Sequence, residues 1–358
     1  MLINRPTAMR FDRAAEIHQL AWRKSCNIAA GENGKQNGVE RDYILPSDKW
    51  LLGVWQPIRS SLGEYLEVSG VQANTGKHNL KSSWTQCANV FFPFRQYPSF
   101  RTLFARFLAD KTGFDVDQVE QIEFEYAAPG TLEPKRLLGE TKGKRGSGQT
   151  SPDIAVIFGT ADGKSGLYLI ENKYTEHSFY DCSGAKPPSE LEARGLEPNP
   201  NPERCKHLSE IIADHASMCH EHKWGRRYWE ILHDTFDAQI AVTIAVCPAL
   251  RAGYQLMRQQ ALAEGIVRSR LFDFVVHGVS FDERNYTLVS CLKPLGIENF
   301  SSGWGRLFRS DVRFVCFTHQ ELVSFVERQS SGSTLASWVD YVSRRYGYSS
   351  SHHHLNPL

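Results

Sequence analysis

The stretch Ser151–Glu176, SPDIAVIFGTADGKSGLYLIENKYTE, decides the fold of this chain. Its two apolar, β-prone runs flank a turn rich in Gly, Asp and Ser, which predicts a β-hairpin. Asp153 stands at the start of the first run, and Glu171 and Lys173 stand near the end of the second. Side chains alternate along a strand, so Glu171 and Lys173 share one face. A turn centred at residues 162–163 would place Asp153 opposite Lys173, with Glu171 diagonal to it.

Two carboxylates and one ammonium on a single patch suit a hard divalent cation beside a phosphate. Oxygen ligands of this kind select Mg²⁺ or Mn²⁺, which can activate a water and offset charge on a phosphoryl group. In this interpretation Asp153 and Glu171 hold the metal. Lys173 orients the attacking water or stabilises the developing negative charge. The alternative is an ordinary hairpin with a surface salt bridge between Asp153 and Lys173.

The motif Pro152-Asp153, a spacer and Glu171-Asn172-Lys173 resembles the PD-(D/E)XK nuclease superfamily, whose fold many restriction endonucleases share. Similarity to a bacterial branch of restriction endonucleases extends to four segments, Ser82–Asn89, Phe124–Tyr126, Arg145–Asp153 and Glu171–Glu176. The resemblance covers roughly the middle of the chain. It implies a three-layer α/β fold with an αβββαβ core and a mixed sheet, with helical additions at both ends. It also implies Mg²⁺-dependent hydrolysis of DNA in restriction or genome defence.

A third acidic residue often precedes the hairpin in that superfamily. The run Val119–Ala127, VEQIEFEYA, predicts a strand with its apolar residues on one face and with Glu123 and Glu125 together on the other. Glu125 is the candidate, because its Phe-Glu-Tyr setting resembles the related proteins. The alternative is a solvated carboxylate on the polar face of an edge strand.

Two other functions stay open at this point. The first is a non-catalytic nucleic-acid-binding or scaffold protein that keeps the fold, although an intact Asp153, Glu171 and Lys173 set speaks against it. The second is cleavage of RNA, since no residue here distinguishes a 2′-hydroxyl group. The strand motif holds no histidine that could replace the metal as a base, and His177 lies just past it. A homodimer is compatible with cutting both DNA strands, but no residue argues for it.

Composition is that of an ordinary globular protein, with 358 residues, 41% apolar and 23% charged. The net charge of +1 excludes a polycation, so a DNA surface has to come from local clusters such as Lys142–Arg145 and Arg226–Trp229. No run approaches the ~20 apolar residues that span a bilayer, and residues 1–10 are not a secretory signal. These features predict a cytoplasmic protein without membrane contact.

The eight cysteines are scattered without the spacing of a disulfide framework, which favours a reducing compartment. Cys182, Cys205 and Cys219 fall in and after a Pro-rich insert, with three histidines nearby at positions 207, 220 and 222. Three thiols and one imidazole would make a structural Zn²⁺ site, and four thiols including Cys247 would suit an Fe–S cluster. The chain has no CxxC pair here, so buried or loop thiols are the alternative.

The remaining patterns divide the chain into three parts. A mainly helical region covers residues 1–95, a nuclease core covers 96–290 with a loop insert at 182–203, and a C-terminal addition with a disordered tail covers 291–358. Helices are predicted over Phe11–Ala30, Lys49–Val68, Ser82–Phe92, Ser99–Ala109, Arg204–His233, Tyr254–Leu262 and Leu335–Tyr346. Beyond the hairpin, strands are predicted over Ala238–Val246, Leu271–Ser280 and Arg313–Thr318, the first of them as a central strand buried on both faces.

Overall fold

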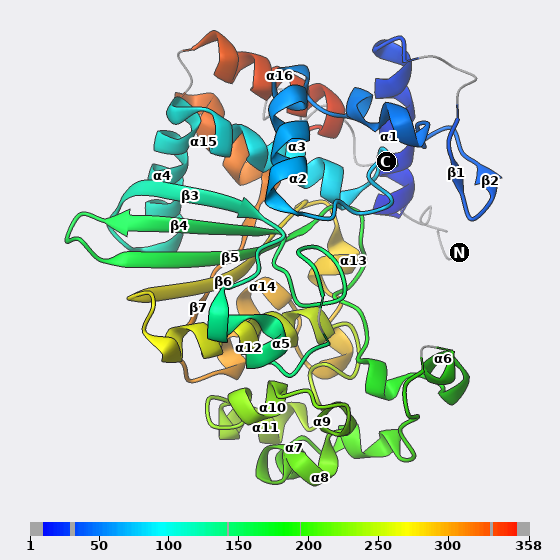
Figure 1. Ribbon diagram of the computed structural model, residues 1–358, viewed down its shortest axis with the longest axis vertical. Helices are drawn as coiled ribbons and strands as arrows, with labels where there is room; N and C mark the ends of the chain where they lie inside the picture. The colour runs from blue at the N-terminus through cyan, green and yellow to red at the C-terminus, as the bar shows by residue number, and fades with distance from the viewer. Residues whose placement is uncertain (1–9, 29–32, 142, 194, 330–331, 349–358) are drawn as a thin grey trace, which may run out of the picture.

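The computed structural model describes residues 10–28, 33–141, 143–193, 195–329 and 332–348 (Figure 1). Its centre is a six-stranded sheet in the order β3-β4-β5-β6-β7, with β8 also paired to β6. The strands are β3 (Val116–Phe124), β4 (Ile154–Thr160), β5 (Ser165–Lys173), β6 (Phe274–Phe281), β7 (Arg313–Phe314) and β8 (Phe317–Thr318). The first three run antiparallel, and β6 lies parallel to β5. The chain is therefore an α/β protein with a mixed central sheet, as expected.

Helices cover both faces of this sheet, because successive strand residues enter two separate apolar cores. Val156 belongs to one core and its neighbour Ala155 to the other. The first core contains residues of α1 (Phe11–Ser25), α2 (Arg59–Ser69), α3 (Ser83–Gln96), α4 (Pro98–Thr112), α15 (His319–Gln329) and α16 (Ser333–Tyr346). The second contains residues of α10 (Tyr228–Leu232) and α12 (Tyr254–Ser269). The result is three layers, helices, sheet and helices (Figure 1).

The elements around the hairpin give the series αβββαβ that the resemblance implies, with α12 and β6 as its last helix and strand. Helix α4 leads into the meander β3-β4-β5, and α12 then precedes β6, which gives the series αβββαβ. A long connection between β5 and α12 carries only short helices, which are α6 (Pro188–Glu192), α7 (Leu208–Ala213), α8 (His215–Met218), α9 (His220–Lys223), α10 and α11 (Ala238–Ile244). The region over Arg204–His233, which was predicted to be helical, thus consists of several short helices.

The predicted central strand over Ala238–Val246 was wrong, because most of this run forms helix α11. Asp237 caps the helix, since its Oδ1 accepts hydrogen bonds from the backbone N–H groups of Gln239 at 2.8 Å and Ile240 at 3.3 Å. The run is also not buried on both faces, since Val242 is 77% exposed. The place beside β5 is taken by β6, which pairs with it along the whole length of β6.

Smaller elements complete the described chain. They are β1 (Lys35–Gln36), β2 (Val39–Glu40), α5 (Pro134–Leu137), α13 (Tyr286–Val289) and α14 (Phe300–Gly303), with several 3₁₀ turns between them. The predicted disordered tail from 349 onwards lies outside the described residues, as does Lys142. Over the described ranges, no helix has both the length and the apolar character that a membrane crossing requires.

Candidate active site at the end of the hairpin

The hairpin register brings two carboxylates directly opposite each other. Ile154 on β4 pairs with Ile170 on β5, and one further step of this register sets Asp153 opposite Glu171. The expectation that Asp153 would face Lys173 was therefore wrong by two residues. The last pair before the turn is Gly159 with Ser165. This turn position sets the register of the whole hairpin, so that Asp153 lies opposite Glu171 and not opposite Lys173.

Asp153 is fixed between the two neighbouring strands. Its backbone carbonyl accepts a hydrogen bond from the N–H of Glu125 at 2.9 Å, just past the end of β3. Its Oδ2 atom accepts another from the backbone N–H of Asn172 on β5 at 2.7 Å. The carboxyl group is thus held at the point where β3 ends, β4 begins and β5 passes.

Glu171 and Lys173 form a buried ion pair on the same face of β5. Lys173 Nζ lies 2.8 Å from Glu171 Oε1 and donates to Gln255 Oε1 of α12, also at 2.8 Å. The second carboxylate oxygen of Glu171 accepts a hydrogen bond from Gln259 Nε2. Only 4% of Glu171 and 3% of Lys173 is exposed. The alternative of a surface salt bridge to Asp153 therefore does not describe this lysine.

Glu125 does not share a strand face with Glu123, contrary to the sequence prediction. Strand β3 ends at Phe124, and Glu125 takes a left-handed backbone conformation with φ 48°. This backbone turn directs Glu125 into the same cavity as Asp153. Glu123 instead forms ion pairs with Arg95 at 3.0 Å and Arg145 at 2.7 Å. Glu123 is therefore bound to two arginines, whereas Glu125 faces the cavity that also contains Asp153.

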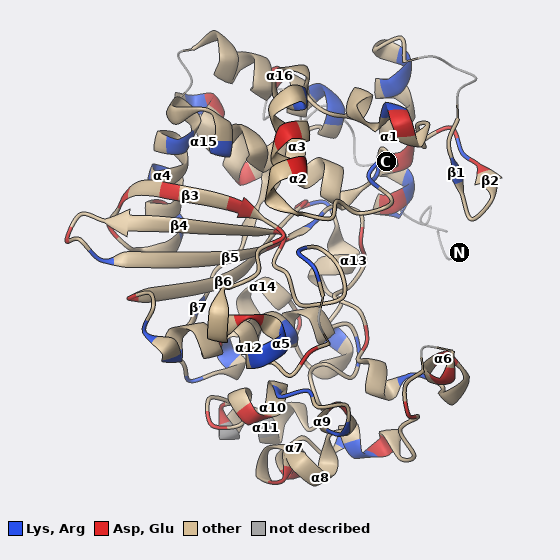
Figure 2. Cartoon of the chain, in the orientation of Figure 1, with Lys and Arg blue, Asp and Glu red and all other residues tan. Residues whose placement is uncertain are grey.

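Glu125, Asp153 and Glu171 line one cavity of about 210 Å³. Its walls come from the ends of the three meander strands, from the loop over residues 146–151 and from α12. In Figure 2 the acidic colour gathers where β3 ends and β4 begins. The loop approaches closely at Gly146, where an added Cβ would lie 3.0 Å from the Glu125 carboxyl carbon. A glycine there, with φ +83°, leaves room for that carboxyl group.

The electrostatics of this cavity are dominated by surplus negative charge. Burial, with the Glu171 carboxylate next, raises the pKa of Glu125 to about 8. Burial also raises the pKa of Asp153 well above its ordinary range, and the Glu171 and Glu125 carboxylates add to this effect. For Lys173, burial lowers the pKa, but Glu171 and the other nearby carboxylates raise it further than burial lowers it. The cations nearby are already paired, since Lys173 lies beside Glu171 and Arg258 of the cavity wall lies 3.3 Å from Glu140.

Sequence reasoning missed the contribution of α12. Gln255 and Gln259 are four residues apart and reach Lys173 and Glu171 from one helix face. Gln259 is itself oriented by His277 of β6, whose Nε2 lies 3.2 Å from Gln259 Oε1. The i, i+4 spacing of two glutamines in a helix that follows the hairpin was the available signal.

Three arginines of the two basic clusters named from the sequence, Arg145, Arg226 and Arg227, make contacts within the protein, whereas Lys144 is exposed and Lys142 lies outside the described residues. In the cluster Lys142–Arg145, Arg145 cross-links its loop to β3 through Glu123 and the backbone carbonyl of Phe124, each at 2.7 Å. In the cluster Arg226–Trp229, both aromatic residues are buried in the second core. Among the described residues of these two clusters, no aromatic side chain lies exposed beside the basic ones.

The donor set of the cavity fits a hard divalent cation. Its donors are carboxylate oxygens, and a cation would offset the repulsion that raises the pKa of Asp153 and Glu125. Both oxygens of Glu171 already have partners in Lys173 and Gln259, so a metal would take over at least one of these contacts. Across the residues that the structure describes, no three His, Cys, Asp or Glu side chains stand ready to hold one ion.

Fold and site together define an α/β protein with an acidic cavity at one end of a mixed sheet and a buried lysine paired to one of its carboxylates. Residues 16–347 match the family described as Restriction Endonuclease associating with ARP, so the chain belongs to this family. The match spans nearly the whole chain, beyond the middle part on which the sequence resemblance rested. No significant match was found among curated proteins or among solved structures.

Proposed function

We propose that this protein is a Mg²⁺- or Mn²⁺-dependent endonuclease of the PD-(D/E)XK type that hydrolyses DNA phosphodiester bonds in restriction or genome defence. Family membership supports the restriction-endonuclease class. The observation that carries the proposal is the meeting of Glu125, Asp153 and Glu171 in one cavity, with Lys173 paired to Glu171. The αβββαβ order supports a restriction-endonuclease-like core around it.

Each charged group has a distinct part in this proposal. Asp153 and Glu171 would hold the divalent cation, which lowers the pKa of a water and offsets charge on the phosphate. Lys173 orients the attacking water or stabilises negative charge on the phosphoryl group, because its ammonium is fixed by Glu171 and Gln255. Glu125 borders the same cavity and is the third acidic residue of the site.

The surroundings of the site suit this function in two further respects. All eight cysteines are free, which fits a reducing compartment such as the cytoplasm. Cutting both strands of a duplex would be served by a homodimer with two sites, which the mass of the protein in solution would test.

We expect purified protein to cut DNA with Mg²⁺ or Mn²⁺ and to lose this activity in EDTA. Ca²⁺ should support DNA binding without cleavage, because its looser coordination polarises a bound water less. Asp153→Asn should lower the cleavage rate about 100-fold or more and still fold, since the amide oxygen of asparagine can accept the same hydrogen bond from the Asn172 N–H. Gel assays of cleavage and binding, with thermal melting of each variant, measure these outcomes.

Glu120→Gln is the matched control, because it removes one charge from an exposed position on β3. This variant should cut like the wild type. Undiminished cutting in excess EDTA, or by folded Asp153→Asn, would contradict the metal mechanism. Cleavage of RNA but not DNA would select the RNA alternative, and absence of any cleavage with DNA binding intact would select the non-catalytic alternative.

A further inference from the structure

The carboxylate cavity carries one basic side chain in its wall. Among the described residues that line this cavity, Arg258 of α12 is the only arginine, lysine or histidine. It follows Gln255 by three residues and precedes Gln259 by one, so the three side chains leave the same side of the helix. The Arg258 side chain is 23% exposed. A positive charge is thus built into a cavity whose other walls are acidic or neutral.

The ion pair of Arg258 with Glu140 occupies only one edge of the guanidinium. Its Nε donates to Glu140 Oε1 at 3.3 Å and to Thr150 Oγ1 at 3.0 Å. Its Nη2 lies 3.3 Å from the same oxygen of Glu140. The third nitrogen, Nη1, donates to no described residue and is reached by solvent. Because a guanidinium has five N–H donors, the edge away from Glu140 keeps donors that a ligand can use.

Glu140 is held by several donors besides Arg258. Its Oε2 accepts a hydrogen bond from the Thr150 N–H at 2.6 Å, and its Oε1 accepts one from the Tyr228 hydroxyl at 2.8 Å. Burial raises the pKa of Glu140, but Arg258 and then these hydrogen bonds bring it below its ordinary value, so the carboxylate is ionised. Glu140 therefore fixes the direction of the guanidinium, while its own charge is shared among several donors.

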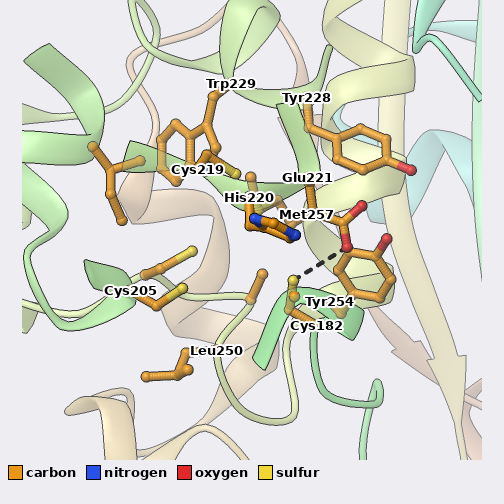
Figure 3. A pocket seen from close by; sticks show the side chains of 14 residues that line it. Cys182, Cys205, Cys219, His220, Glu221, Tyr228, Trp229, Leu250, Tyr254 and Met257 are labelled. Atoms are coloured by element: carbon orange, nitrogen blue, oxygen red, sulfur yellow. Dashed lines mark hydrogen bonds between the residues drawn. The ribbon is translucent and has the colours of Figure 1, made fainter. Parts of the chain in front are cut away.

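Two tyrosines pack beside the guanidinium. The guanidinium carbon of Arg258 lies 5.4 Å from the ring centroid of Tyr254, one turn earlier on α12. The rings of Tyr254 and Tyr228 meet edge to face at 6.2 Å, and Figure 3 shows them next to each other. A cation held against an aromatic ring and an anchored carboxylate has little freedom to turn. The open donors of Arg258 are thus set in place before a ligand arrives.

The same tyrosines border a second cavity, which contains the cysteines considered from the sequence. Four thiols line it, several of which Figure 3 shows, namely those of Cys182, Cys205, Cys219 and Cys247. Its volume is about 20 Å³, room for one water, and Cys182 Sγ donates to the buried Glu221 Oε1 at 3.3 Å. This side of α12 is closely packed, whereas the other opens on the larger carboxylate cavity. A metal centre at the thiols stays a prediction from the sequence.

The open donors of Arg258 suit a phosphate group. A planar guanidinium binds phosphate oxygens through parallel N–H bonds, and its charge offsets theirs. Lys173 is already bound to Glu171 and Gln255, so Arg258 is the cation of this cavity wall that retains free donors. We propose that Arg258 binds a phosphate of the DNA backbone inside the carboxylate cavity, and this inference rests on the proposed nuclease function. The alternative is an arginine whose only role is to neutralise Glu140.

The test is the salt dependence of DNA binding in Ca²⁺. Fluorescence anisotropy of a labelled duplex of mixed sequence gives the dissociation constant at a series of salt concentrations. Arg258→Gln should weaken binding about 10-fold or more, because a charge-assisted hydrogen bond is lost. It should also reduce the slope of log K against log salt by about one, since one phosphate contact disappears. An arginine that only neutralises Glu140 would leave this slope unchanged.

Arg268→Gln is the matched control. Arg268 lies on the same helix and pairs with Asp234 at 2.6 Å, but it stands outside the walls of the cavity. This variant should keep the slope of the wild type. Because Arg258→Gln leaves a buried carboxylate without its cation, the same change is also made in a Glu140→Gln background. The combined variant should melt close to Glu140→Gln and still have a slope lower by about one.

The nuclease proposal and this inference fail in different ways. Wild-type protein that binds no DNA with any metal would remove the nuclease proposal and the role of Arg258 with it. Wild-type protein that binds and cuts DNA, together with an unchanged slope in both Arg258 variants, would overturn only the role of Arg258. An equal loss of slope in Arg268→Gln would overturn it as well, because the effect would then not depend on the cavity.

Discussion

Lys173→Met should abolish DNA cleavage and should also destabilise the metal-free protein by about 3–5 kcal/mol. Methionine keeps most of the side-chain volume, so the effect isolates the charge. Without the ammonium, Glu171 becomes a buried carboxylate without a cation, next to Asp153 and Glu125. The effect on stability follows from the burial of the ion pair, since only 4% of Glu171 and 3% of Lys173 is exposed.

A double-mutant cycle separates the two roles of the lysine. Lys173→Met combined with Glu171→Gln should recover most of the lost stability, because both charges leave together. The double variant should remain inactive. Lys164→Met is the control, since this lysine pairs with Asp162 on the exposed hairpin turn and its loss should leave the stability close to that of the wild type. Urea denaturation in EDTA measures these differences. Unchanged stability of Lys173→Met would contradict the importance of the buried pair.

Glu125→Gln should make the metal-free protein more stable at alkaline pH and leave it unchanged in acid. The pKa of Glu125 is raised from its ordinary 4.5 to about 8 in the folded protein. Its contribution to stability is therefore fully present below pH 4.5 and is lost as pH rises through about 8. Near pH 9 the variant should exceed the wild type by up to about 5 kcal/mol, because each of the roughly 3.5 pKa units of the rise corresponds to about 1.4 kcal/mol.

Denaturation in EDTA at pH 5 and pH 9 provides the measurement. The raised pKa of Asp153 also makes the free energy of unfolding fall as pH rises. The informative quantity is therefore the difference in free energy of unfolding between variant and wild type at each pH. Glu120→Gln should show no such difference, because its carboxylate is exposed on the same strand. An equal effect of Glu125→Gln at both pH values would show that Glu125 is already ionised in the metal-free fold.

Local patterns predicted the hairpin well and also located α12 and β6, but they placed an additional strand between the hairpin and α12. Apolar alternation and a Gly-rich turn are local signals, and they located β4 and β5. They did not predict the register. A shift of the pairing by two residues leaves every side chain on the same face of the sheet, so the alternation of apolar residues fits both registers equally well. The apolar, β-branched run Ala238–Val246 was predicted as a strand but forms a helix. Asp237 caps this helix, and the position beside β5 that the strand would need is occupied by β6.

Contacts between distant segments could not be predicted from spacing. Glu125 enters the cavity because the backbone turns after Phe124, and no periodic pattern records a single left-handed residue. The contact between the glutamines of α12 and the site could not be predicted, because it depends on how the fold packs that helix beside Glu171. The four cysteines have irregular spacing, and their meeting depends on how the long connection folds back on itself.

The parallel pairing of β5 with β6 also sets an order for folding. The meander β3-β4-β5 contains contacts between neighbours in sequence, whereas β6 joins only after a connection of about 100 residues has closed. Closing such a loop costs about 4 kcal/mol of chain entropy, so β6 should add late. Until then β5 is an open edge strand, and its Glu171 and Lys173 discourage pairing with another chain. The charges proposed for catalysis thereby also protect the newly made protein from aggregation.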